Sequence, residues 1–422
     1  MLRVAATDAA HRQGALFFNP GGPGQDGLAT PVEFFQIFAG SDPAHSQGAL
    51  QLRLLAEFDL IGFSPRGTGD STALTCVTPL RERAVDYSPA GLAAQNLESA
   101  FFNLATIAEA CHRNPLTPFI SSDTTARDMD LLRAVLGEQR VNYFGVPYGT
   151  WLGAWYASLF PDRVGRMLLD SSWDFGSTME HNFNQHPKSF HRVLDEVLLP
   201  YATRHPEAFG LGTSTASLRT ALLGLPDPLL DVLSLPLFEL SYYAWDAERH
   251  LDHIKAALVL QRLMEPGEPS DEGRVRQGIE DSVFVAGDVQ RDQAIREVAH
   301  AVFDSYVQRW LAPPPPKSLT QDPMASTYWA VRCNDTPSTR DRAYWVDLLH
   351  TLAPDYPLFY SVLLDNPCPF WTTGGVQKPP ITPMQKLDIL LVQSQFDAPT
   401  PKEGADALFA ALPAAHRVYV PG

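Results

Sequence analysis

Short apolar runs that stop at glycine- and proline-rich turns recur through the first part of the chain. The run at 15–18 ends in such a turn, and so does the run at 141–144. A segment over 150–160 follows the second turn, and its large apolar residues share one helical face before a further run at 164–169. Strands that alternate with helices build a mostly parallel sheet with helices on both faces. The sequence therefore predicts an α/β fold that binds ligands beyond the carboxyl ends of its strands.

The pattern changes after residue 172. Long helical stretches with scattered aromatic residues follow, interrupted by proline-rich segments, and a buried strand returns at 389–393. We therefore expect the first part of an α/β core over 1–172, a mainly helical cap and connection over 173–375, and the C-terminal part of the core over 376–422.

The charge of the chain limits its partners. The chain has 48 acidic and 32 basic residues and a formal net charge of -16, which argues against nucleic acid and anionic membrane surfaces as partners. We expect a neutral or cationic ligand, with no cofactor and no metal. No apolar stretch is as long as a membrane span requires. The N-terminus does not have the pattern of a signal peptide, because Asp8 precedes any hydrophobic run.

Four cysteines, Cys76, Cys111, Cys333 and Cys368, fall into two pairs of similar separation. None belongs to a C-x-x-C motif or to a cysteine and histidine cluster that could bind a metal. The spacing favours a disulfide within each pair, although four cysteines allow three connectivities and four buried thiols are the alternative. Disulfides would place the protein outside the reducing cytosol.

The turn after the strand at 141–144 reads Gly145-Val146-Pro147-Tyr148-Gly149. In a G-x-S-x-G turn between a strand and a helix, the serine oxygen attacks a substrate carbonyl while backbone N–H groups stabilise the oxyanion. Pro147 has no nucleophilic oxygen, and its ring holds φ at about −65°, whereas the nucleophile of such a turn is strained. We therefore expect this turn to be distorted or different. Alone, a G-x-P-x-G sequence is typical of an ordinary turn.

Several further segments accompany this turn, and together they resemble the tripeptidyl-aminopeptidase and proline-iminopeptidase branch of the α/β-hydrolases. They are Asn19-Pro20-Gly21-Gly22-Pro23-Gly24, Gly67-Thr68-Gly69, Phe160-Pro161-Asp162-Arg163-Val164, Met167-Leu168-Leu169-Asp170, Cys333-Asn334-Asp335, Cys368-Pro369-Phe370-Trp371 and Gln395-Phe396-Asp397-Ala398-Pro399-Thr400-Pro401. The resemblance implies an α/β-hydrolase fold, with a mostly parallel sheet flanked by helices and an inserted helical cap. It also implies a serine exopeptidase that releases amino acids or short peptides from free N-termini.

The resemblance assigns roles to single positions. Pro147 stands where the nucleophilic serine is expected, and Asp397 matches the acid that orients a catalytic histidine. Gly21 and Gly22 match the loop that donates one N–H to the oxyanion hole, and Tyr148 matches the residue whose N–H supplies the other. The alternatives are a loop aspartate that caps the next helix, two turn glycines and a half-buried tyrosine.

The same resemblance pairs Cys76 with Cys111 and Cys333 with Cys368, at positions that form disulfides in secreted relatives. It therefore implies a secreted or periplasmic protein. It also implies that the cap supplies a carboxylate for the ammonium group of a substrate, but the sequence does not single out that acid.

The chain departs from the family pattern at two places besides Pro147. Relatives have an aspartate at the position of Ser64, which we interpret as structural because it follows a different strand. The catalytic histidine of the family follows the position of Gly422, whereas His416 precedes the last strand and is expected on the surface at its opposite end. Leu2-Arg3-Val4-Ala5 looks like the tail of a strand. We therefore expect a sequence clipped at both ends and no hydrolysis by the chain as written.

Two histidines of the cap, His250 and His253, share a helical face with Asp246 close by. Such a group could hold an ion. We interpret it as a solvated face of the cap.

Three functions remain open at this point. The first is an exopeptidase of the serine-hydrolase family with an altered nucleophile position. The second is a non-catalytic protein that keeps the pocket and binds peptides or apolar ligands. The third is an esterase or lipase, because the same fold supports several chemistries. In each case the expected partner is a peptide or a small molecule.

Overall fold

A seven-stranded sheet forms the centre of the computed structural model, which describes residues 1–240, 247–264 and 271–421. Its strand order is β1-β3-β2-β4-β5-β6-β7. β1 pairs antiparallel with β3, and every other neighbouring pair is parallel. The strands are β1 (Leu2–Val4), β2 (Gly14–Asn19), β3 (Phe58–Gly62), β4 (Val141–Gly145), β5 (Val164–Asp170), β6 (Ile389–Ser394) and β7 (His416–Val420). The predicted mostly parallel sheet is confirmed.

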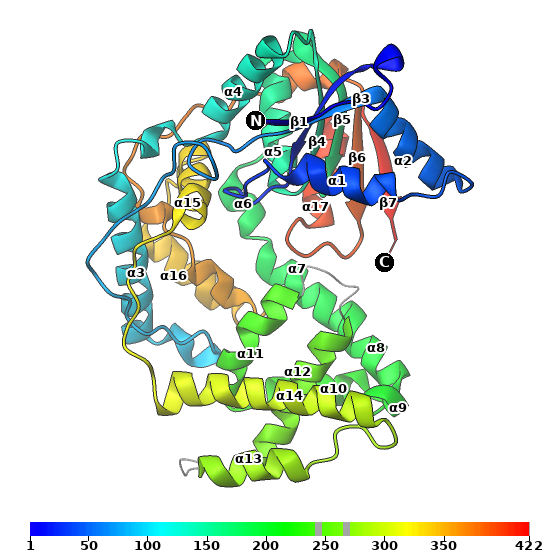
Figure 1. Cartoon of the computed structure of the whole chain (residues 1–422). Coiled ribbons are helices and arrows are strands. Elements are labelled where there is room, and N and C mark those ends of the chain that lie inside the picture. Colours follow the sequence, from blue (N-terminus) through cyan, green and yellow to red (C-terminus); the bar gives the residue numbers. More distant parts are fainter. Residues whose placement is uncertain (241–246, 265–270, 422) are drawn as a thin grey trace.

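Helices flank this sheet (Figure 1). Those of the sheet region are α1 (Thr30–Ala39), α2 (Ser46–Glu57), α4 (Ser122–Val135), α5 (Tyr148–Leu159) and α17 (Lys402–Ala411). α3 (Ala94–His112) lies away from the sheet and packs against α16 (Arg342–Leu352). α5 packs against β4 and β5 and is buried along almost its whole length. Its tryptophans Trp151 and Trp155 are fully buried. The burial of these large apolar side chains fixes the helix that follows the altered elbow.

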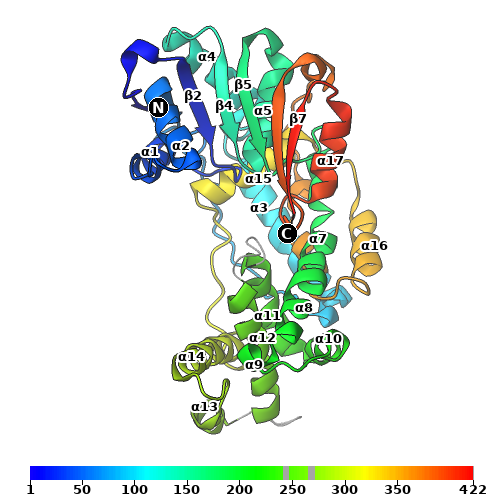
Figure 2. The same cartoon turned by 90° about the vertical axis from the view of Figure 1, so that its right-hand side faces the viewer.

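A second group of helices lies to one side of the sheet, as Figures 1 and 2 both show. It comprises α6 (Met179–Phe183), α7 (His186–Val193), α8 (Leu199–Arg204), α9 (Pro206–Phe209), α10 (Thr215–Leu223), α11 (Asp227–Leu240), α12 (Ala247–Leu263), α13 (Glu272–Asp281) and α14 (Val289–Tyr306). From α7 to α14 these helices share an apolar core that includes Leu233, Leu251 and Phe303. This is the inserted helical cap. The buried Met179 and Phe183 of α6 belong instead to the core of the sheet. α15 (Pro323–Asp335) then returns to the sheet, where Ala330 and Val331 join its core, and α16 (Arg342–Leu352) lies farther from the sheet beside α3.

Within the described ranges, no single helix has the length and apolar composition of a membrane span. Thr215–Leu223 and Asp227–Glu239 reach these values only as a pair, which is bent by 114°.

One interpretation of the cap was wrong. His250 is fully buried in α12, because this helix packs against both α11 and α14, so the residue does not lie on a solvated face. His253 is partly exposed, and its Nδ1 lies 2.8 Å from the carbonyl oxygen of Arg249. Asp246 lies outside the described residues. No group of three or more metal-binding side chains occurs in the described part of the chain.

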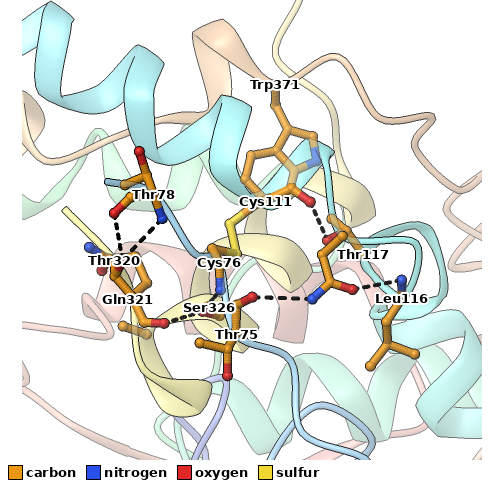
Figure 3. Close-up of a disulfide and its surroundings, with 12 residues drawn as sticks. Thr75, Cys76, Thr78, Cys111, Leu116, Thr117, Thr320, Gln321, Ser326 and Trp371 are labelled. Atoms are coloured by element: carbon orange, nitrogen blue, oxygen red, sulfur yellow. Dashed lines mark hydrogen bonds between the residues drawn. A yellow bond between two sulfur atoms is a disulfide. The ribbon is translucent and has the colours of Figure 1, made fainter. Parts of the chain in front are cut away.

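Both expected disulfides are present, Cys76–Cys111 and Cys333–Cys368, and each spans 35 residues. Figure 3 shows the first of them beside Thr117 and Ser326. The Cys76 N–H donates to Ser326 Oγ at 2.9 Å, and Thr117 Oγ1 donates to the Cys111 carbonyl at 2.6 Å. Because Ser326 and Cys333 both lie on α15, the two disulfide regions hold this helix in place.

Candidate active site

Four loops that follow neighbouring parallel strands meet at one cavity of about 1410 Å³. They follow β2, β4, β5 and β6, and they contribute Gly22, Pro147, Ser171 and Asp397 to the cavity wall. We call this side the core wall. The carboxyl ends of parallel strands share one edge of a sheet, which explains why residues so far apart in sequence meet here.

The altered elbow keeps the hydrogen bonds of a tight turn. The Val146 N–H donates to the Asn19 carbonyl at 3.1 Å, and the Gly149 N–H donates to the Val146 carbonyl at 2.7 Å. A Cβ on Gly145 would lie 2.4 Å from the Gly149 carbonyl oxygen, so this position requires glycine. Pro147 has φ of 11° and ψ of −92°, away from the φ of about −65° that its ring favours. The expected distortion of the turn is present.

The glycine loop after β2 approaches this elbow closely. Gly21 has φ of +104°, and a Cβ there would lie 2.8 Å from the Val146 carbonyl oxygen. Its N–H already donates to Asn19 Oδ1 at 3.1 Å. Gly22 lines the cavity instead, and the Tyr148 N–H, the first of α5, has no backbone partner among the described residues. Gly22 and Tyr148 therefore suit the two oxyanion donors better than Gly21 does.

A buried polar network supports the elbow from beneath. Tyr148 Oη lies 2.8 Å from Ser122 Oγ. The carboxylate of Asp335 accepts hydrogen bonds from the Ser122 N–H at 2.8 Å and from Trp151 Nε1 at 2.9 Å. Asp335 is 1% exposed, and burial raises its pKa to about 7. Sequence reasoning noted the segment that contains Asp335 but assigned this residue no role.

Asp397 lies in the loop after β6, half-buried on the core wall. Its Oδ1 accepts the Thr400 N–H at 2.8 Å, and burial raises the pKa of its carboxyl group. α17 begins with Pro401 as its N-cap residue and has no side-chain cap, so the helix-capping alternative for Asp397 is wrong. The role of triad acid stays a prediction.

Residues 14–258, more than half of the chain, match the family model described as the alpha/beta hydrolase fold. The chain belongs to the α/β-hydrolase family. A second model, described as TAP-like protein, matches residues 356–422 of this α/β-hydrolase.

Three curated relatives with different activities are similar in sequence to this α/β-hydrolase. The tripeptidyl aminopeptidase of Streptomyces coelicolor is 28% identical over 94% of this chain and 67% of that protein. The carboxylesterase B of Mycobacterium tuberculosis is 30% identical over 96% of this chain and 73% of that protein. The serine protease Hip1 of the same species is 32% identical over 55% of this chain and 42% of its own length.

Two interpretations about other residues of this α/β-hydrolase are confirmed. Ser64 Oγ donates to Asp26 Oδ1 at 2.8 Å and accepts the Asp70 N–H at 3.3 Å, so this hydroxyl holds its own loop. His416 begins β7 and its side chain is 75% exposed, with Nε2 at 3.4 Å from Asp388 Oδ1. The amino end of a parallel strand faces away from the cavity.

Other lining residues of the α/β-hydrolase cavity come from outside the strand-end loops, and we call these the cap-side wall. Asp231 on this wall is fully engaged, because it accepts Arg309 Nη2 at 2.9 Å, Trp310 Nε1 at 3.0 Å and the Tyr87 N–H at 2.8 Å. Glu82 accepts the Lys317 N–H at 3.2 Å.

Asp365 differs from these two acids. It is open to the cavity, and no described side chain forms a hydrogen bond or ion pair with its carboxylate. The surrounding protein nevertheless raises the pKa of this group by burial, while the charge of Arg332 acts in the opposite direction. Sequence reasoning missed Asp365, since a single acid before Cys368 forms no motif.

Proposed function

We propose that this α/β-hydrolase binds peptides through their free N-termini in the cavity between core and cap, and that it does not hydrolyse them. The observation that carries the proposal is Pro147 at the elbow, on the wall of an otherwise formed cavity. The tripeptidyl aminopeptidase among the relatives supports a peptide ligand.

Pro147 removes the covalent step of a serine peptidase. That step needs a hydroxyl oxygen to attack the substrate carbonyl, and a proline ring offers none. The groups expected to stabilise the developing oxyanion are the Tyr148 N–H at the start of α5 and Gly22 on the core wall, and neither depends on the side chain at position 147. In this proposal they orient a carbonyl group of the peptide, with no nucleophile to attack it.

Asp365 is the acid that best suits a peptide's terminal ammonium group. The other two acids of the cap-side wall have partners within hydrogen-bond distance, whereas the Asp365 carboxylate is open. A partly desolvated carboxylate pairs strongly with an ammonium group, because the surrounding protein screens the attraction less than water does.

Two assays test this function. Isothermal titration calorimetry is expected to show binding of tri-alanine amide and much weaker binding of its N-acetylated form. Assays with alanyl and tri-alanyl p-nitroanilides are expected to show no turnover. Turnover that a serine-directed phosphonate abolishes would contradict the non-catalytic proposal.

The variant Pro147→Ser then separates an altered enzyme from a binding protein. Recovered hydrolysis of the p-nitroanilides would support an enzyme whose nucleophile has been replaced. Unchanged peptide binding without hydrolysis, in a variant that keeps its thermal unfolding midpoint, would support the binding protein.

An esterase is the second candidate, and the carboxylesterase B relative is the observation that favours it. Hydrolysis of p-nitrophenyl esters by Pro147→Ser without any hydrolysis of the p-nitroanilides would select it. In either case the two disulfides support a secreted or periplasmic location, which fractionation of the native host would test.

A further inference from the structure

His186 is a buried histidine on the cavity wall whose two ring nitrogens differ. The residue opens α7 and is 6% exposed. Its Nε2 lies 2.9 Å from the carbonyl oxygen of Pro399. A carbonyl oxygen only accepts hydrogen bonds, so Nε2 carries the ring hydrogen. Nδ1 is therefore the acceptor nitrogen of this imidazole.

The acceptor nitrogen is without a partner among residues 1–240, 247–264 and 271–421. No donor lies within hydrogen-bond distance of Nδ1 in the described part of the chain, and Nδ1 is not among the buried polar atoms that are sealed from solvent. Since the ring lines the cavity, we infer that this accessible nitrogen faces it. The rings of Phe183 and Phe190 pack edge-on against it, with centroids at 4.9 and 5.7 Å, and hold its orientation.

The imidazole keeps this lone pair at neutral pH. Burial lowers the pKa of His186 to about 4, the charge of Arg332 also lowers it, and the bond to the Pro399 carbonyl acts in the opposite direction. A neutral ring with one fixed hydrogen presents a pure acceptor to whatever occupies the cavity.

We propose that His186 Nδ1 accepts a hydrogen bond from a backbone amide N–H of a bound peptide and so makes the cavity selective for amides over esters. This inference rests on the proposed function and names the chemical class of its ligand. An amide N–H donates to the lone pair, whereas an ester oxygen in the same place presents another lone pair. The terminal ammonium group suits the charged Asp365 better than it suits a neutral ring.

The size of the effect follows from the unpaired acceptor. A site that is built to receive an N–H rejects the analogue that lacks it, because its own buried polar group is left without a partner. We expect one ester-containing analogue to bind about 10- to 100-fold more weakly than the parent peptide.

The test uses tri-alanine amide and two analogues, in which lactic acid replaces the second or the third residue so that one backbone N–H becomes oxygen. Each is titrated calorimetrically into the wild-type protein and two variants. His186→Asn places its side-chain amide near the position of Nδ1 and keeps an acceptor toward the cavity. His186→Gln places its amide near Nε2 and keeps the donor to Pro399. Comparison of these two variants distinguishes a role of His186 in recognising the ligand from a role in holding the loop that contains Pro399.

We expect wild type and His186→Asn to discriminate against one analogue, and His186→Gln to bind that analogue and the parent equally. Equal discrimination by wild type and His186→Gln would overturn the inference and assign His186 a purely structural role. Binding of all three ligands with the same affinity by wild type would also overturn it, while leaving the proposed peptide binding intact. Failure of all three ligands to bind wild type would overturn the proposed function, and the inference with it.

Discussion

The core wall and the cap-side wall of the cavity hold their polar groups in different ways. On the core wall, the elbow and the acid loop have partners close in sequence: the Pro147 carbonyl accepts the Thr150 N–H, and Asp397 accepts the Thr400 N–H. On the cap-side wall, Asp231 is held by Arg309 and Tyr87, which are 78 and 144 residues away, and Asp365 has no such partner among the described residues. Local turns therefore contribute to the geometry of Pro147 and Asp397, whereas the recognition groups opposite depend on the whole fold.

The largest expected effect concerns Asp335, beneath the core wall. Its pKa rises from 3.8 to about 7 on folding because the residue is buried. Well below pH 4 both the folded and the unfolded chain carry the proton. As the pH rises toward 7 the unfolded chain releases it first, so the free energy of unfolding decreases by something on the order of 4 kcal/mol. Chemical denaturation at pH 4 to 8 measures this decrease.

Asp335→Asn removes this titration and is expected to flatten the pH dependence of stability. The absolute stability of the variant also changes, because the amide presents a donor where Trp151 Nε1 or the Ser122 N–H needs an acceptor. The slope with pH is therefore the diagnostic quantity. A wild-type and a variant curve that run parallel would show that Asp335 is ionised at every pH and that the network tolerates its charge.

The two disulfides provide a comparison of equal loops. Each closes 35 residues, so replacing either pair by serine is expected to lower the free energy of unfolding by about 3–4 kcal/mol. Their positions differ, because Cys333 lies two residues before Asp335 on α15 and Cys368 lies three residues after Asp365. The Cys333→Ser, Cys368→Ser variant should also weaken binding of tri-alanine amide. If the two double variants bind tri-alanine amide with equal affinity, the Cys333–Cys368 disulfide does not support the peptide-binding groups of the cap-side wall.

The same contrast explains what the sequence could predict. The parallel sheet, the Gly145 to Gly149 turn and the loop of Asp397 depend on short segments whose turn residues and periodicity are visible locally. Asp365 and His186 reach the cavity only through packing of distant helices, which no local pattern encodes. His250 shows the same limit, because its helix looks polar on one side yet is covered by two neighbours.

Asp365→Asn tests the cap-side wall directly. Loss of the charge is expected to weaken binding of tri-alanine amide by about 10- to 100-fold, which corresponds to about 1.5–3 kcal/mol for a charge-assisted hydrogen bond. Binding of the N-acetylated peptide should not change. Asp347→Asn, on the exposed face of α16, is the matched control. If both aspartate variants bind the free peptide as wild type does, another group receives the ammonium.

The smallest expected effect tests whether the two walls are mechanically joined. Ser189 belongs to cap helix α7, yet its Oγ donates to the Ala398 carbonyl at 2.6 Å, next to Asp397. Ser189→Ala leaves that buried carbonyl without this donor and is expected to lower the free energy of unfolding by about 1–2 kcal/mol. Ser99→Ala, on the partly exposed face of α3, should change it by less than about 0.5 kcal/mol.

Hydrogen exchange at the Thr400 N–H, which is bonded to Asp397, locates the effect of Ser189→Ala. Faster exchange at this amide than in wild type, with the central strands unchanged, would mean that the cap helix holds the acid loop in place. Unchanged exchange at Thr400, combined with the expected loss of stability, would mean that Ser189 stabilises the cap alone. The core wall would then depend on its own turns, as its sequence-local bonds suggest, and motion of the cap would leave Asp397 where it is.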